Sequence, residues 1–179
     1  MMRCLTVVLL LSAFWMAPAA AQQASSRFDP PARIHEYAVS LVDVVSWGSV
    51  AGSTLLDQIG GNPEDWSFSD RALSNAARFV LEVSLYHGVA AIQDRSTWYQ
   101  PCECTAIPAR TAHAFAEAFT DRDRAGGTHV SAARIGAPYG AAVAEALWRP
   151  DTSIGDALMT GSTSLVFTGL FNIVREFLR

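Results

Sequence analysis

The sequence contains no lysine, so all 13 of its basic residues are arginines. This absence excludes functions that need a lysine amine, including a P-loop, a Schiff base and a lysine general base. Acidic residues outnumber basic ones at 17, which gives a formal net charge of −4 at pH 7. A chain with this balance offers no basic patch to a phosphate backbone, and we therefore expect no nucleic-acid partner.

Recognisable catalytic and metal-binding motifs are also missing. The chain has no Gly-x-Ser-x-Gly, no His-Glu-x-x-His and no glycine-rich phosphate loop before a helix. No second pair of ligands stands near Cys102 and Cys104 to complete a zinc site. We therefore expect no metal and no cofactor, and the motifs leave open whether the protein is an enzyme.

The first residues have the pattern of a signal peptide. Arg3 supplies one positive charge, residues 5–16 are apolar, and an Ala-x-Ala ending precedes Gln22. The apolar run is shorter than the ~20 residues that an ordinary transmembrane helix needs. We predict that residues 1–21 are removed and that residues 22–179 form one exported domain, whose charge without Arg3 is −4 − 1 = −5. The alternative is an uncleaved anchor.

Two of the three cysteines lie in the mature chain, since Cys4 belongs to the predicted signal peptide. Export places Cys102 and Cys104 in an oxidising compartment, which makes them a disulfide candidate. A bridge across one intervening residue closes a tight ring, and strained bridges are the more easily reduced ones. Two interpretations stay open, a structural staple of the loop and a redox site.

Helical periodicity runs through the mature chain without a competing strand-like alternation. Ser153 followed by Asp156 resembles a capping box at the start of the last helix. A long loop over residues 94–107 and a charged turn over residues 121–127 separate other helices, and Pro138 should bend one of them. The sequence predicts an all-α bundle of about five helices, over residues 30–59, 70–93, 108–120, 130–148 and 153–178.

Small residues and long uncharged stretches favour close packing of helices in a membrane. The expected packing seams are Ala132, Gly136, Gly140 and Ala144 on the fourth helix, and Gly48 and Gly52 on the first. Residues 157–174 carry no charge, and Arg78 and Glu82 on the second helix are spaced to pair. We expect the protein to be associated with a membrane, and either to self-associate or to bind another envelope protein. A soluble bundle with Ala/Gly-rich seams is the alternative.

One helical face could carry chemistry. Arg110, His113 and Glu117 share it, so that a histidine base, an orienting carboxylate and an anion-binding guanidinium stand together. The long loop adds three candidate ligand-binding residues, namely Asp94, Arg95 and Tyr99. The competing interpretation makes the same residues a hydrogen-bonded brace between the loop and the bundle, and we expect the brace.

Residues 107–116 resemble the Pro-Ser-Gly-His-Thr-Ala box of the type 2 phosphatidic acid phosphatase superfamily. That resemblance implies a helical, membrane-embedded fold and histidine- and arginine-based hydrolysis of phosphate esters. Ala109 and Arg110 replace the serine and glycine, and the histidine before Thr111 is missing. Arg134 could stand for a later arginine, but the His and Asp that should follow it and the first-box lysine are absent. The resemblance therefore supports the fold and argues against that catalysis.

The last ninety or so residues resemble a family of bacterial exported helical envelope proteins to which no activity is assigned. The matching positions are Asp94, Arg95, Trp98, Tyr99, Arg110, His113, Ala114, Trp148, Pro150, Asp151, Asn172, Glu176 and Phe177. This resemblance implies an envelope location and no substrate. The resulting hypothesis is an exported, membrane-associated, non-enzymatic envelope protein. The alternatives are a divergent phosphatase-like hydrolase acting on a phosphate-bearing ligand, and a periplasmic binding or redox module at the Cys102/Cys104 loop.

Overall fold

The computed structural model of the chain describes residues 28–150 and 152–178. Most of these residues are helical, and the prediction of an all-α bundle is confirmed. The predicted signal peptide, residues 1–21, lies outside the described residues. The helices are α2 (Pro30–Val42), α3 (Val44–Gly60), α4 (Phe68–Ile92), α5 (Ile107–Ala116), α6 (Ala132–Glu145) and α7 (Ile154–Phe177).

Local sequence signals explain where the two longest helices begin. Ser67 caps α4 and Ser153 caps α7, and each serine hydroxyl accepts the N–H of an aspartate three residues later. The aspartate carboxylate accepts the serine N–H in return, so both starts are capping boxes. The capping box predicted at Ser153 is thereby confirmed.

The single helix predicted over residues 30–59 is wrong, because Asp43 divides it into α2 and α3. The backbone of Asp43 is extended, with φ −64° and ψ 121°, and its carboxylate accepts the N–H of Ser46. An aspartate side chain that satisfies the first free N–H groups of a new helix favours a helix start at that residue. The apolar periodicity continues across the break, which is why the break escapes a search for periodicity.

A short hairpin replaces parts of two predicted helices. Strands β1 (Thr120–Arg122) and β2 (Thr128–Val130) pair antiparallel, and the predicted charged turn connects them. The third helix therefore ends at Ala116 rather than at residue 120, and the fourth begins at Ala132 rather than at residue 130. Strands of three residues are too short for an alternating pattern to be visible in the sequence.

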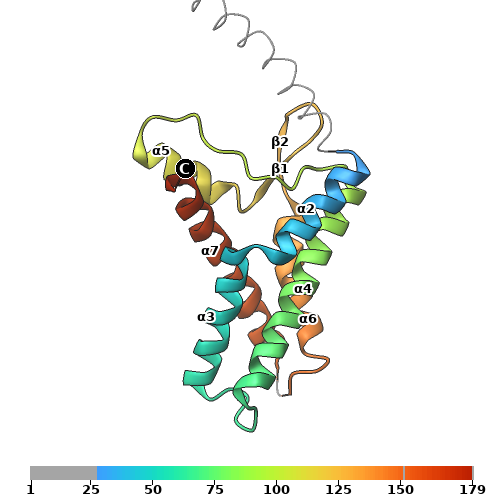
Figure 1. Ribbon diagram of the computed structural model, residues 1–179, viewed down its shortest axis with the longest axis vertical. Helices are drawn as coiled ribbons and strands as arrows, with labels where there is room; N and C mark the ends of the chain where they lie inside the picture. Colours follow the sequence, from blue (N-terminus) through green and yellow to red (C-terminus); the bar gives the residue numbers. More distant parts are fainter. Residues whose placement is uncertain (1–27, 151, 179) are drawn as a thin grey trace, which may run out of the picture.

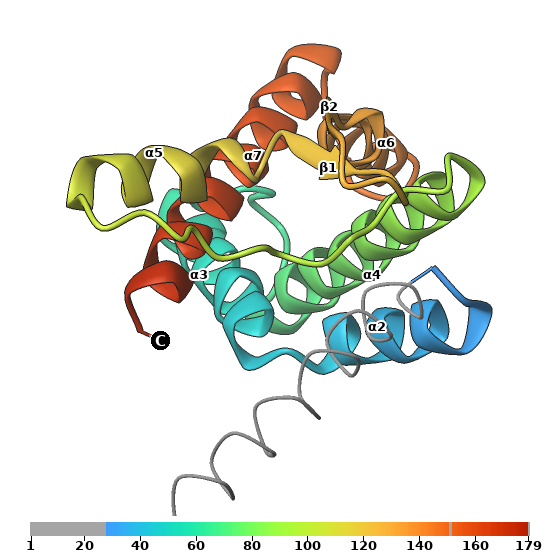
Figure 2. The same cartoon turned by 90° about the horizontal axis from the view of Figure 1, so that it is seen from above.

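The helices enclose a central space beneath a polar cap. Helix α4 contacts α3, α2 and α6, and α6 contacts α7. Figure 1 shows these helices as an upright trunk, with α5, the hairpin and the long loop at its upper end. Seen from above, α3, α4, α6 and α7 surround the centre, and the loop after α4 crosses over it (Figure 2). The trunk and this cap bring distant segments of the chain together at the upper end.

Small residues form the closest helix contacts, but most of them are not the predicted ones. The seam of α6 is Ala133, Ala137 and Ala141, one position along from the expected face, and all three are buried. A Cβ on Gly140 would lie 3.1 Å from Leu85, whereas one on Gly136 would meet no described atom within 4 Å. Because α6 is rich in alanine on several faces, composition alone does not identify the packed one.

The other predicted glycines are open, and two glycines of α7 are the crowded ones. Cβ atoms on Gly48 and Gly52 would meet no described atom within 4 Å. A Cβ on Gly169 would come within 2.6 Å of two ring carbons of Phe115, and one on Gly161 would press on the ring of Tyr139. Close approach of α7 to its neighbours therefore depends on these two glycines.

Candidate functional site

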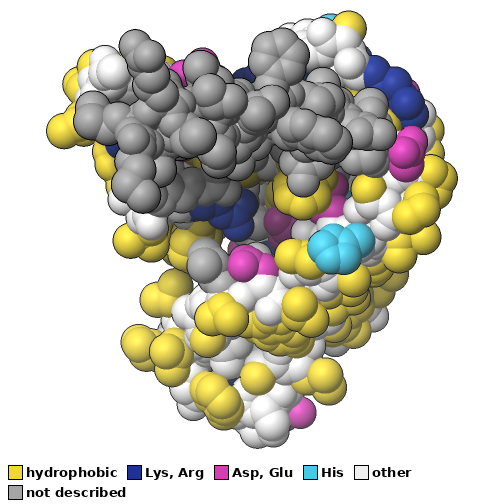
Figure 3. Space-filling model, turned by 45° about the horizontal axis from the view of Figure 1, so that its top comes forward, with side chains coloured by type: hydrophobic (Ala, Val, Ile, Leu, Met, Phe, Trp, Pro, Cys, Tyr) yellow, Lys and Arg dark blue, Asp and Glu magenta, His cyan; other side chains and the backbone are white. Residues whose placement is uncertain are grey.

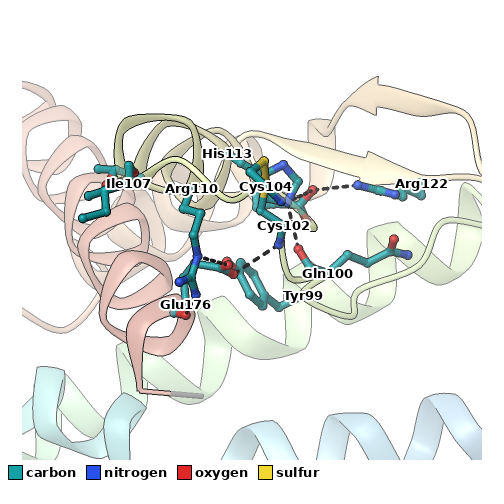
Figure 4. Close-up of a disulfide and its surroundings, with 11 residues drawn as sticks. Tyr99, Gln100, Cys102, Cys104, Ile107, Arg110, His113, Arg122 and Glu176 are labelled. Carbon is teal, nitrogen blue, oxygen red and sulfur yellow. Dashed lines mark hydrogen bonds and ion pairs between the residues drawn. A yellow bond between two sulfur atoms is a disulfide. The ribbon is translucent and has the colours of Figure 1, made fainter.

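A buried carboxylate organises the upper end of α7. Glu176 accepts hydrogen bonds from the Tyr99 hydroxyl at 2.6 Å, the Cys102 N–H at 3.3 Å and the Arg110 Nε at 3.2 Å. The same guanidinium donates to the Glu176 carbonyl and lies 4.7 Å from the ring centroid of Phe177. Figure 4 shows Glu176 between the loop and α5. One side chain thus joins α7, α5 and the long loop.

His113 does not form the predicted hydrogen-bonded pair with Glu117. Its Nε2 lies 2.9 Å from the backbone carbonyl of Gln100 and 3.9 Å from Oε1 of Glu117. A carbonyl only accepts, so Nε2 carries the proton and donates it to Gln100. That nitrogen is consequently unable to act as a base, and it holds the loop against α5.

Glu117 faces a different partner. It is buried, and its Oε1 lies 3.4 Å from Nη2 of Arg122 on β1. The predicted face therefore sends Arg110 to α7, His113 to the loop and Glu117 to the hairpin. These contacts are the arrangement expected of a brace, because each polar group is used to hold a neighbouring segment.

The three loop residues predicted to converge on this face are divided between two places. Tyr99 reaches Glu176, but Asp94 bridges Arg33, at 2.9 Å, and Arg124 of the hairpin turn. Hydrogen bonds from Arg124 hold the pKa of the Asp94 carboxyl below its usual value. Asp94 therefore ties the start of α2 to the hairpin rather than to the Arg110 face.

Arg95 also faces the hairpin. Its guanidinium lies 3.8 Å from Asp121 and 3.5 Å from Asp123. The ring of His129 stands 2.8 Å from Asp123 and, by this hydrogen bond, lowers the pKa of that carboxyl. The exposed hairpin is thus a cluster of paired charges.

Cys102 and Cys104 are joined by a disulfide, with their Cα atoms 5.1 Å apart. The bridge lies between α5 and Glu176, since Cys102 donates its backbone N–H to that carboxylate (Figure 4). This position fits a loop staple, and it leaves the redox interpretation untested. Within the described residues, no group of three His, Cys, Asp or Glu side chains is placed to hold a metal ion.

A second polar cluster lies inside the trunk, and only part of it was predicted. Arg78 pairs with Glu82 at 3.8 Å, as its spacing predicts, and with Glu145 on α6 at 3.3 Å. Glu145 also pairs with Arg149 at 3.1 Å, and Arg149 reaches Asp57 on α3 at 3.1 Å. The i, i+4 spacing of Glu145 and Arg149 signals their own pair, but the links between helices depend on the fold.

Searches of protein-family models, of curated proteins and of solved structures find no match to this chain. The two resemblances given above therefore stay predictions.

Proposed function

We propose that this protein is an exported helical bundle embedded in a membrane of the cell envelope. In this proposal it acts by non-covalent packing with itself or with another envelope protein, and it is not an enzyme. The proposal is based on where polar and apolar side chains lie: large apolar side chains are exposed and polar ones are buried, the opposite of the arrangement in a soluble protein.

The largest fully buried side chains are polar: Glu176, Asn75, Thr54 and Ser131. Most buried apolar residues are alanines, whereas large apolar side chains lie on the outside of the trunk. Representative exposed fractions are Val44 83%, Ile59 84%, Leu73 72%, Leu147 87% and Met159 73%. Figure 3 shows hydrophobic side chains spread over the lower trunk. Soluble proteins bury such residues, and exposed apolar surface of this extent marks a membrane or protein contact.

Two stretches are long and apolar enough to cross a membrane by length and composition, Ile154–Phe177 (α7) and Pro30–Gly60, although Asp43 divides the second into α2 and α3. Length and composition alone do not separate a membrane span from the core helix of a soluble protein. A core helix is mostly buried, however, and here only 28% and 12% of the apolar windows are buried. Helix α7 has 24 residues, or about 36 Å at 1.5 Å per residue, against a hydrocarbon core of about 30 Å.

The charged groups of the trunk suit this environment. Intramembrane charges face the interior of a bundle and pair with one another. Arg78, Glu145, Arg149 and Asp57 do so between three helices and the segment after α6. Three of the more exposed ion pairs lie in the hairpin and the start of α2, where they would stand in water or among lipid headgroups, and a fourth, Arg175–Asp43, joins the upper end of α7 to the break between α2 and α3.

The non-enzymatic part of the proposal depends on the brace. Arg110, His113 and Glu117 each hold a different segment, so the Arg110 guanidinium, the His113 Nε2 and the Glu117 carboxylate are all engaged in contacts within the protein. This argues for a structural use of these residues and does not favour the hydrolase alternative.

Membrane fractionation tests the proposal. The chain should remain in the membrane pellet after sodium carbonate extraction and should float with vesicles on a density gradient. Flotation is the necessary control, because aggregated protein also pellets but does not float. Recovery of the mature chain as a soluble monomer without detergent would contradict the proposal.

A further inference from the structure

The helices of the trunk line a partly open cavity of about 580 Å³, and the proposed function assigns no ligand to it. Its walls come from α2, α3, α4, α6 and α7, and the loop residues Thr97, Trp98 and Tyr99 line its upper end. Pockets of roughly 300–1,000 Å³ hold small molecules and cofactors. On one face of the molecule, acidic and basic side chains stand in a recess with hydrophobic ones beside it (Figure 3).

Three buried donors of this cavity have no hydrogen-bond acceptor among the described residues; one of them, Arg78 Nε, lies 3.3 Å from Glu145 in an ion pair, and the other two belong to Asn172 and Arg134. Asn172 of α7 is 6% exposed, and its Nδ2 has no hydrogen-bond acceptor there. Arg134 of α6 donates through Nη2 to the Thr97 carbonyl at 3.0 Å, but its buried Nε has no acceptor within the described chain. Buried donors without acceptors are rare in native structures, and each one needs an explanation such as water, an ion or a ligand.

Both donors lie at the same end of the cavity. Arg134 contacts the loop through Thr97, and Asn172 is one turn of α7 before Glu176, which contacts the loop through Tyr99. Thr97 and Tyr99 are two residues apart. Arg134 and Asn172 both line the cavity, and a guanidinium N–H and an amide N–H together suit a ligand group with two acceptor oxygens.

The other arginines of the cavity already have carboxylate partners. Arg78 and Arg149 belong to the interior ion pairs, and Arg175 lies 3.9 Å from Asp43. By contrast, no carboxylate in the described part of the chain lies within ion-pair distance of Arg134, which instead covers the ring of Tyr86 at 5.2 Å. Arg134 is thus the cation that remains available to a ligand.

Part of the remaining wall is apolar and fits an alkyl chain, beside the serine, threonine and acidic residues that also line the cavity. Phe79, Val83, Phe167, Phe171 and Ala137 line the cavity along three helices. We infer that the cavity binds a single-chain carboxylate amphiphile, a fatty acid in chemical terms. Its carboxylate accepts from Arg134 and Asn172, and its chain lies between the aromatic walls. This inference depends on the interior of the bundle and not on the apolar exterior that carries the proposed function.

Binding of tritiated dodecanoate to the purified full chain in lipid nanodiscs tests the inference, with empty nanodiscs as the background. We expect saturable binding above that background. Dodecanol, which keeps the chain and loses the carboxylate, should compete at least tenfold more weakly than dodecanoate. Acetate, which keeps the carboxylate and loses the chain, should not compete. Equal competition by dodecanol, or no binding above empty nanodiscs, would overturn the inference.

Variants identify the donors. Arg134→Gln should weaken dodecanoate binding at least tenfold, while Arg124→Gln, which removes an arginine of the exposed hairpin, should leave it unchanged. Asn172→Asp places a second carboxylate beside the ligand and should also weaken binding tenfold. It serves as the independent test if Arg134→Gln does not fold, as judged by helical circular dichroism. Wild-type affinity in a folded Arg134→Gln or Asn172→Asp protein would contradict the assignment.

Discussion

Gly161 and Gly136 offer opposite responses to one added methyl group. A Cβ on Gly161 would press on the Tyr139 ring, with even the ring Cγ at 3.0 Å, whereas a Cβ on Gly136 would meet no described atom within 4 Å. Overpacking costs roughly 1–3 kcal/mol, and replacing glycine by alanine inside a helix gains up to about 1 kcal/mol. Gly161→Ala should therefore lower the free energy of unfolding by about 0–2 kcal/mol, while Gly136→Ala should raise it by up to about 1 kcal/mol.

The assay is thermal unfolding of both variants in the same detergent, followed by helical circular dichroism. At this chain length 1 kcal/mol corresponds to roughly 2–4 °C in Tm, so the two variants should differ by several degrees. Shortening Tyr139 to Ala should remove the penalty of the Gly161 substitution, and a double-mutant cycle measures that coupling. If Gly161→Ala is as stable as Gly136→Ala, the described contact between α6 and α7 is wrong.

Three further predictions concern the polar cap. His113→Gln should lower Tm, and any cellular phenotype should follow the amount of folded protein; normal folding with lost function would instead indicate a site. Glu176→Gln replaces the charged acceptor that faces Arg110 and should lower the free energy of unfolding, measured with a chemical denaturant, by about 1.5–3 kcal/mol. An unchanged denaturation midpoint would show that Glu176 is not the hub at which α7, α5 and the long loop meet. The lowered pKa of Asp94 means that its contribution to stability is full above the unfolded value of about 3.9 and is lost as pH falls through the folded pKa. The protection of the hairpin amides, which is the intrinsic exchange rate at each pH divided by the observed rate, should therefore fall in acid, less so in Arg124→Gln, and an equal fall in both would contradict this bridge.

The helices could be predicted wherever the sequence carries its own start and stop signals. Ser153 with Asp156 and Gly60 with Pro63 are such signals, because the caps act within one helical turn. Asp43 is also a local cap, but it stands in a stripe that suits one continuous helix, so its capping role is visible only in the structure. The hairpin is stabilised by pairing between strands too short to show a pattern.

The candidate site could be predicted only as a helical face. The i, i+3 and i+7 spacing of Arg110, His113 and Glu117 places them together, but it does not specify what they contact. The Glu176 hub joins residues 66 to 77 positions away, and no local pattern encodes such contacts. The unpartnered donors Asn172 and Arg134 likewise become visible only when the cavity is formed.

The most direct test of the membrane proposal is the environment of the exposed α7 surface. A nitroxide attached at Met159→Cys, a position 73% exposed in the structure, should be relaxed strongly by oxygen and weakly by a water-soluble nickel chelate when the protein is in lipid vesicles. The same label at Thr128→Cys on the exposed strand β2 should show the opposite preference. Strong relaxation of the Met159→Cys label by the nickel chelate would place this face in water and contradict the account.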